Sequence, residues 1–176
     1  MASVQAGGCF VANGGQWNGE ALFMTELGGS EVWLTADRVV VGYENGEVSE
    51  TEMQRAHPGA VTGEGELPWR YSFLLGNDPS EWFTSVPCYS AVRYENAWPG
   101  VDLLVSHEGS GLRFKAVIDV PGSAAQVSFR TRALKRGASC PSLALSSAAR
   151  SASAMTRPST RSPRNSSRWL SGRVGA

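Results

Sequence analysis

The sequence predicts an all-β fold, a sandwich-like arrangement of antiparallel sheets that is incomplete as encoded. Short runs of alternating apolar residues are separated by turn-forming Gly, Pro and Asn residues roughly every 8 to 12 positions. No amphipathic helical pattern of about ten residues or more occurs before residue 130. The same region supplies large side chains for a core, namely Trp17, Trp33, Trp69, Trp82 and Trp98.

The charge of the chain is divided between two unlike parts. All 16 acidic residues precede residue 130, where they accompany six basic residues, so this part carries a net charge of −10. Ten basic residues follow, from Arg130 to Arg173. We therefore expect an irregular N-terminal segment over residues 1–9, a β-rich domain over residues 10–130 and a basic tail over residues 131–176.

The tail is rich in Ser, Ala and Arg and contains no acidic residue, no Phe and no Tyr. Its low hydrophobicity and positive charge predict disorder. A basic arm for nucleic acid is a second interpretation, but the tail lacks interleaved aromatic residues and any binding motif. We favour a third hypothesis, that the tail is translated in a shifted reading frame, because the strand pattern of Val127–Arg130 stops abruptly.

The first predicted strands form a hairpin near the N-terminus. A turn at Asn13-Gly14-Gly15 precedes two apolar runs, over residues 21–27 and 31–43. Gly28-Gly29 lies between these runs and supplies the positive φ that a tight hairpin turn requires. The second run breaks into two strands at a turn over residues 35–38.

The segments that follow are less regular. Asn45-Gly46 predicts a type I′ turn, and residues 48–55 suit a short helix or an exposed edge strand, of which we favour the strand. His57-Pro58-Gly59 ends this segment. Residues 60–67 are polar and interrupted by glycine, so they predict a weak strand or a loop, whereas residues 69–75 predict an aromatic strand.

Further short strands are predicted in the second half of the domain. Residues 82–86 and 90–94 predict two strands on either side of Pro87, because proline cannot donate a hydrogen bond to a ladder. Residues 101–107 and 112–120 predict a final hairpin around a glycine-containing turn.

Few residues suggest catalysis or metal binding. His57 and His107 have no Cys or His at ligand spacing, so we expect no zinc site. Cys9, Cys88 and Cys140 are widely spaced and allow at most one disulfide. Gly109-Ser110-Gly111 lies in a predicted turn and lacks the nucleophile-elbow pattern. We therefore expect no catalytic residue, no metal and no cofactor.

Carboxylates could serve two other kinds of site. A glycoside hydrolase needs two carboxylates in one cleft, for which Glu64 or Asp102 would be candidates. Glu64 and Glu66 fit better as charges that protect an exposed sheet edge. Asp78 and Asp102 could be calcium ligands, but no DxDxDG spacing occurs, so we favour a turn-stabilising role for both.

Two stretches of the sequence carry distinctive motifs with fixed spacing. The first is F-x-x-N-x-G-Q-W at residues 10–17, with V-W-L-T at residues 32–35. The second, over residues 76–103, is G-N-D-P-x-x-W-x-T-x-V-P-x-Y-x-x-V-R-Y-x-x-x-W-P-G-V-D-L. The residues that carry the pattern are Asn13, Gln16, Trp17, Trp33, Gly76, Asn77, Asp78, Pro79, Trp82, Pro87, Tyr89, Arg93, Tyr94, Pro99, Gly100 and Asp102.

These stretches resemble a bacterial N-terminal domain of unknown function that precedes SBBP-type β-propeller repeats in secreted proteins. The resemblance covers residues 10–130, which correspond to the first half of that domain, and the family has no established catalytic residue. Trp98 stands where the family usually has Tyr. From the residue types, Trp82, Tyr89 and Tyr94 are expected to fill the end of the sandwich, and Arg93 to pair with Asp102 or Asp78 or to remain solvated.

The resemblance implies an extracellular or cell-surface location, although no signal peptide is visible at the start of the chain. We expect a non-catalytic structural or adhesion module. A carbohydrate-binding sandwich with exposed Trp is the first alternative, and a glycoside hydrolase-like enzyme is the second. Partners are expected among surface proteins or glycans, without nucleic acid, and no apolar run of about 18 residues predicts a membrane span.

Overall fold

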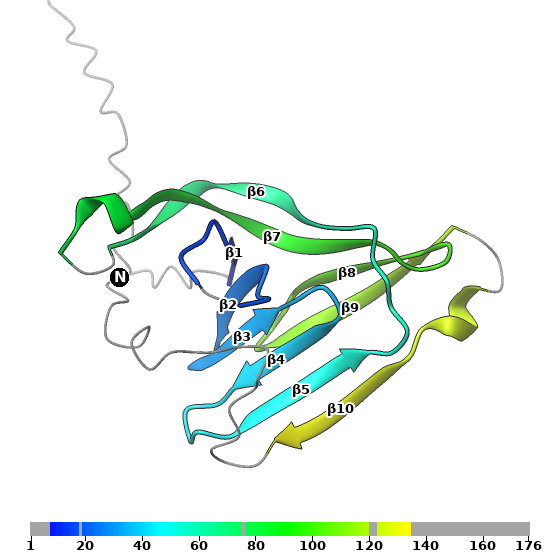
Figure 1. Ribbon diagram of the computed structural model, residues 1–176. Helices are drawn as coiled ribbons and strands as arrows, with labels where there is room; N and C mark the ends of the chain where they lie inside the picture. The colour runs from blue at the N-terminus through cyan, green and yellow to red at the C-terminus, as the bar shows by residue number, and fades with distance from the viewer. Residues whose placement is uncertain (1–7, 18, 75–76, 120–122, 135–176) are drawn as a thin grey trace, which may run out of the picture.

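The computed structural model describes residues 8–17, 19–74, 77–119 and 123–134. These residues form a ten-stranded antiparallel sheet with two short 3-10 helices, which confirms the predicted all-β class (Figure 1). The strands are β1 (Phe10–Ala12), β2 (Phe23–Leu27), β3 (Ser30–Leu34), β4 (Arg38–Gly42), β5 (Val48–Met53), β6 (Ala60–Phe73), β7 (Phe83–Trp98), β8 (Val101–Glu108), β9 (Gly111–Ile118) and β10 (Phe129–Leu134), and the helices are η1 (Pro79–Glu81) and η2 (Ser123–Gln126).

The predicted hairpins form where glycine permits a tight turn. Gly28 and Gly29 adopt φ values of 53° and 82° between β2 and β3, as the sequence predicts. The break at residues 35–38 separates β3 from β4. The ambiguous segment after Gly46 is a strand, β5, which pairs with β4.

Two long strands replace four shorter predicted segments. The weak strand or loop over residues 60–67 and the aromatic strand after it are one strand, β6, and the two strands predicted around Pro87 are one strand, β7. Pro87 lies opposite Arg70, next to a shift in register between Glu66 and Arg70. A bulge of this kind accepts a residue without an N–H group, so the strand continues through the proline.

Strand β7 is shared by two wings of the sheet. β6 pairs with one edge of β7, whereas β1 and β8 pair with successive parts of the other edge. One wing therefore contains β1, β2, β3, β4, β5 and β10, and the other contains β8 and β9. The two wings curl towards each other and enclose the core (Figure 1).

The main core draws apolar side chains from both wings. Full burial of a Val, Leu, Phe or Met side chain contributes roughly 1.5–3 kcal/mol, and burial across the two wings favours the curled arrangement. Its buried members are Phe10, Phe23, Val32, Leu34, Val39, Met53, Ala56, Val92, Tyr94, Ala97, Trp98, Val101, Leu103 and Val105. We call the side of each wing that carries these residues the inner face.

Strand β10 pairs with β5 along its whole length and forms one margin of the sheet. The strand expected over residues 127–130 begins at Phe129 and continues past Arg130 to Leu134. The remaining residues of the expected tail, including Cys140, lie outside the described residues.

Candidate functional site

Asn13 and Gln16 organise the loop between β1 and β2. The Nδ2 atom of Asn13 donates to the carbonyl oxygens of Trp17 and Ala21 at 3.1 and 2.8 Å, and its Oδ1 accepts from the Trp17 N–H at 3.3 Å. The buried Gln16 side chain donates to the Ala12 carbonyl at 2.6 Å. These amides use their polar atoms within the loop, as expected for residues that fix a backbone.

Trp17 closes this loop over the outer face of the sheet. Its ring makes edge contacts with Trp33 and Phe73, with ring centroids 5.1 and 5.2 Å apart. Trp33 is buried beside Val40 in a small second cluster. The Trp33 Nε1–H group has no hydrogen-bond partner among the described residues.

Asp78 fixes the start of η1. Its Oδ1 accepts from the Ser80 N–H at 2.9 Å and from the Ser80 hydroxyl at 2.8 Å. These two hydrogen bonds, the backbone one first, lower the pKa of Asp78. Pro79 occupies the first turn of η1, and Asn77 is exposed before it. Gly76 lies outside the described residues.

The three large residues expected to fill the end of the sandwich behave differently. Tyr94 is fully buried, its hydroxyl donates to the Thr35 carbonyl at 2.9 Å, and burial raises its pKa. Tyr89 is half-buried and packs against Gly63, where a Cβ atom would lie 2.3 Å from the ring. Trp82 is 37% exposed, so the prediction was wrong for this residue.

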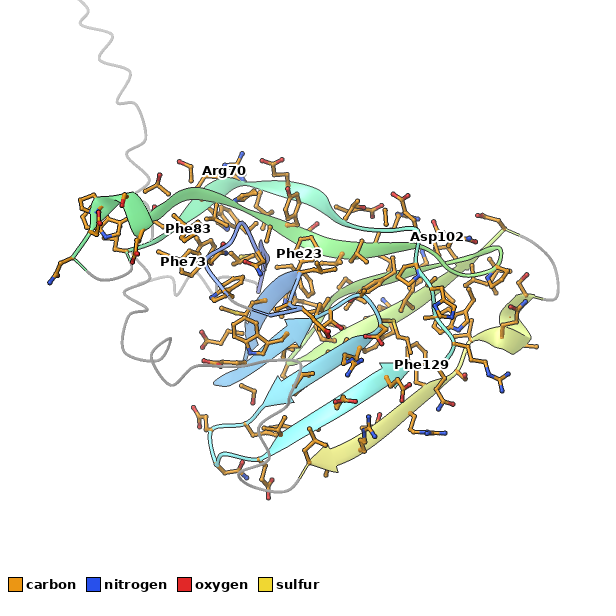
Figure 2. All side chains as sticks on the ribbon, viewed as in Figure 1. Phe23, Arg70, Phe73, Phe83, Asp102 and Phe129 are labelled. Atoms are coloured by element: carbon orange, nitrogen blue, oxygen red, sulfur yellow. The ribbon has the colours of Figure 1, made fainter. Side chains whose placement is uncertain are left out.

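Asp102 ties the β7–β8 turn to the middle of β7. Its Oδ1 accepts from the Asn96 N–H at 2.7 Å, and its Oδ2 accepts from Arg93 Nη1 at 2.9 Å. Asn96 in turn accepts from the Gly100 N–H at 2.9 Å, and the Pro99-Gly100 turn closes with Gly100 at φ 73°. The Asn96 N–H and then Arg93 lower the pKa of Asp102. Asp102 is labelled in Figure 2.

Arg93 joins two carboxylates rather than one. It pairs with Asp102, one of the two expected partners, and also with Glu64 on β6; Asp78 is not among the partners that the structure gives it. The Glu64 and Asp102 carboxylates raise the pKa of Arg93. A general acid needs a carboxyl group with a raised pKa, whereas the pKa of Asp102 is lowered. The arrangement is therefore typical of a structural ion-pair bridge.

The remaining described residues that could carry chemistry do not form a catalytic arrangement. Cys9 and Cys88 are buried free thiols, and burial raises the pKa of Cys88 to about 12. Ser110 lies in the β8–β9 turn. Within the described part of the chain, no group of three or more His, Cys, Asp or Glu could hold a metal ion. No helix formed by the described residues has the length and apolar character needed to cross a membrane.

His107 on β8 is enclosed between the two wings. Its Nε2 lies 2.8 Å from Thr25 Oγ1 on β2, and its ring stacks on Phe10 of β1 with centroids 4.4 Å apart. Its Nδ1 is buried without a partner among the described residues. Burial lowers the pKa of His107 below the ordinary value of 6.5, because a charged imidazolium is poorly solvated there.

We predict that His107 makes the domain less stable in mild acid. The unfolded chain binds a proton near pH 6.5 and the folded chain binds it only at lower pH, so acidification through this window favours unfolding. One such group changes the free energy of unfolding by at most about 1.4 kcal/mol per pH unit. Urea unfolding between pH 7.5 and pH 5, at roughly half-unit steps, measures the slope.

The His107→Gln variant should lose this slope. His57→Gln is the matched control at an exposed position, and it should keep the slope that His107 causes. An equal slope in wild type and His107→Gln would contradict the prediction.

Three of the exposed large apolar side chains lie on the two strands at the margins of the sheet, β9 and β10. Phe114 and Ile118 of β9 are 38% and 45% exposed, and Phe129 of β10 is 40% exposed. The rings of Phe114 and Phe129 meet with centroids 5.6 Å apart, so this end of β10 lies beside β9. We call Phe114, Ala116, Ile118 and Phe129 the edge patch; Phe129 is labelled in Figure 2.

The edge patch was not predicted from the sequence. Phe114, Ala116 and Ile118 alternate with polar or smaller residues, which is the pattern of an ordinary strand with one buried face. Whether that face is covered depends on the next strand in space, and alternation alone carries no information about it.

The sequence model of one protein family, described as Domain of unknown function (DUF7948), matches residues 10–141. The match continues beyond Arg130 and beyond the last residue of β10. No curated protein and no solved structure matches the chain significantly.

Proposed function

Because the chain belongs to the DUF7948 family of domains of unknown function, we propose a non-catalytic role for it, as a structural or adhesion module of a secreted or cell-surface protein. The observation that supports this proposal is that the polar residues of the two motifs form hydrogen bonds and ion pairs within the fold. Asn13 and Gln16 hold a loop, and Arg93 and Asp102 hold a turn to a strand. Their polar atoms therefore bond to the loops, turns and strands of the sheet itself.

The edge patch supports a binding role for the module. Contiguous exposed apolar side chains at the margin of a sheet are typical of contacts with another molecule. A location ahead of propeller repeats in a secreted bacterial protein is part of the same proposal, and the sequence resemblance supports it.

Carbohydrate binding is a second candidate function. Trp69 and Trp82 are 39% and 37% exposed, and exposed Trp rings can stack on sugars. Trp17, Trp33 and Trp98 are buried or half-buried and would contribute nothing to such a surface.

Enzymatic and structural roles of Arg93 and Asp102 can be separated with substitutions. We expect the full chain to hydrolyse none of a panel of fluorogenic glycosides. In a double-mutant cycle with Arg93→Ala and Asp102→Ala, we expect a coupling energy of about 0.5–1 kcal/mol in urea unfolding. The expected value is small because both side chains are partly exposed, so that water screens their interaction.

Glycoside turnover that is lost in Asp102→Ala would overturn the non-catalytic proposal. A glycan array tests the second candidate with Trp69→Ala and Trp82→Ala as the informative variants. Glycan binding by wild type that these substitutions abolish would replace the adhesion proposal with carbohydrate binding.

A further inference from the structure

We propose that the edge of β9 that faces away from β8 is a docking site for an extended strand of another polypeptide, in which apolar side chains alternate with acidic ones. This inference rests on the proposed binding role and names its partner class. The partner strand would add to the sheet beside β9, and its apolar side chains would cover the edge patch.

The first support is the regularity of β9. It pairs with β8 through eight consecutive residue pairs without a register shift. Within the described residues β9 has β8 as its one strand partner, because it is the last strand in the order of the sheet. A straight edge strand offers a row of unpaired N–H and C=O groups, which is the template that strand addition uses.

The edge of β6 that faces away from β7 has no strand partner among the described residues either, but it is built differently. Gly65 has a φ of 63°, and Pro68 lies where the register shifts between Glu66 and Arg70. Bulges, proline and charges are the devices that prevent a strand from adding to an edge. β6 carries these devices and β9 does not, except for its two basic residues.

The second support is the apolar inner face of β9. Phe114, Ala116 and Ile118 lie directly opposite Val105, Leu103 and Val101 of β8. Opposite residues of a ladder share a face, so the β9 residues point to the same side as the main core. Phe114 and Ile118 are 38% and 45% exposed, although the ring of Phe114 contacts that of Phe129. Among the described residues β9 is the last strand in the order of the sheet, so no further strand pairs beyond it.

The third support is charge. β9 contains Arg113 and Lys115 and no acidic residue, although the part of the chain before residue 130 has a net charge of −10. Both basic residues lie on the outer face, opposite Ser106 and Leu104. Arg113 has an exposed ion pair with Glu108 at 3.1 Å, which water and salt weaken. Acidic side chains on the outer face of an added strand would complement both cations.

A second copy of this chain fits the edge less well. Antiparallel pairing of β9 with another β9 would bring Arg113 and Lys115 of both copies together, and like charges across a ladder are unfavourable. The acidic strand β6 of a second copy already uses Glu64 and Glu66 in ion pairs with Arg93 and Arg70. A strand of different sequence therefore fits best.

Fluorescence anisotropy of labelled synthetic peptides tests this inference. The probe is a blocked peptide of alternating Val and Glu with the length of β9, and the comparison peptide alternates Val and Lys. We expect the full chain to bind the acidic peptide about tenfold more tightly, since a few opposite-charge cross-strand pairs suffice for that ratio. Methylation of alternate backbone nitrogens in the acidic peptide should abolish binding.

Variants of the exposed face provide the matched test. Arg113→Glu combined with Lys115→Glu should reverse the preference in favour of the lysine peptide, without loss of thermal stability, because both side chains are exposed. Phe114→Thr should weaken the binding of either peptide.

Equal binding of both peptides, equal binding of the methylated peptide or no binding at all would overturn the inference. Concentration-dependent dimers in light scattering that Lys115→Glu alters would also overturn it in favour of a second copy. None of these outcomes bears on catalysis, whereas glycoside turnover would overturn the proposed function whatever the peptides do.

Discussion

Replacement of Trp98 with alanine is expected to lower the free energy of unfolding by about 3–5 kcal/mol. Trp98 is 1% exposed at the end of β7, and its Nε1 donates to the Gln54 carbonyl at 2.9 Å. Its ring also contacts Phe129 of β10 with centroids 5.7 Å apart. The variant therefore loses the packing that joins β7 to the segment after β5 and to β10, and it leaves the Gln54 carbonyl without its donor.

Urea unfolding followed by far-ultraviolet circular dichroism measures this loss. Trp69→Ala is the matched control, because the Trp69 ring is 39% exposed and its removal should cost less than half as much. A Trp98→Ala variant within about 1 kcal/mol of wild type would show that the ring does not lie in the core that we describe.

Replacement of Tyr94 with alanine is expected to cost a similar amount, about 3–5 kcal/mol. Tyr94 lies in the C-terminal half of β7, fully buried between the wings, and its hydroxyl donates to the Thr35 carbonyl in the β3–β4 turn. The substitution removes both a large apolar contact and the donor to a carbonyl oxygen. Loss of a buried hydrogen-bond partner adds to the cost of the cavity.

The Tyr94→Phe variant separates these two contributions. It keeps the ring and removes the hydroxyl, so we expect a cost of about 1–2 kcal/mol in the same urea experiment. If Tyr94→Phe is as stable as wild type, the bond between Tyr94 and Thr35 is not made in solution.

The turns were the part of the fold that could best be predicted from the sequence. Gly28 and Gly29 adopt the positive φ that their position between two apolar runs requires, and Pro99-Gly100 closes the turn before β8. A local backbone conformation is dictated by local residues, so such turns can be identified without knowledge of the neighbours.

The lengths of β6 and β7, in contrast, could not be predicted from the sequence. Pro87 predicted a break in β7, but β7 continues because β6 shifts its register between Glu66 and Arg70, next to Pro87. The glycines of β6 predicted a weak strand or a loop, but the strand continues through them as the partner of β7. The compensation comes from a partner strand, and a single stretch of sequence does not contain it.

Only one of the two ion pairs of Arg93 could be predicted from the sequence. Asp102 was one of two partners expected for Arg93, whereas the bond to Glu64 depends on the antiparallel pairing of β6 with β7. Similarly, the apolar character of Phe114 and Ile118 was visible in the sequence, but their exposure results from the position of β9 at the end of the sheet.

Amide hydrogen exchange in residues 111–118 tests the open edge of β9 most directly. In an unpaired edge strand, the N–H groups that face β8 are protected and the alternate groups that face outwards exchange quickly. We expect this alternation in β9, and protection of nearly all residues in β8, which pairs on both sides. Uniform protection along β9 in the free protein would contradict the account, because it would mean that the edge is already covered.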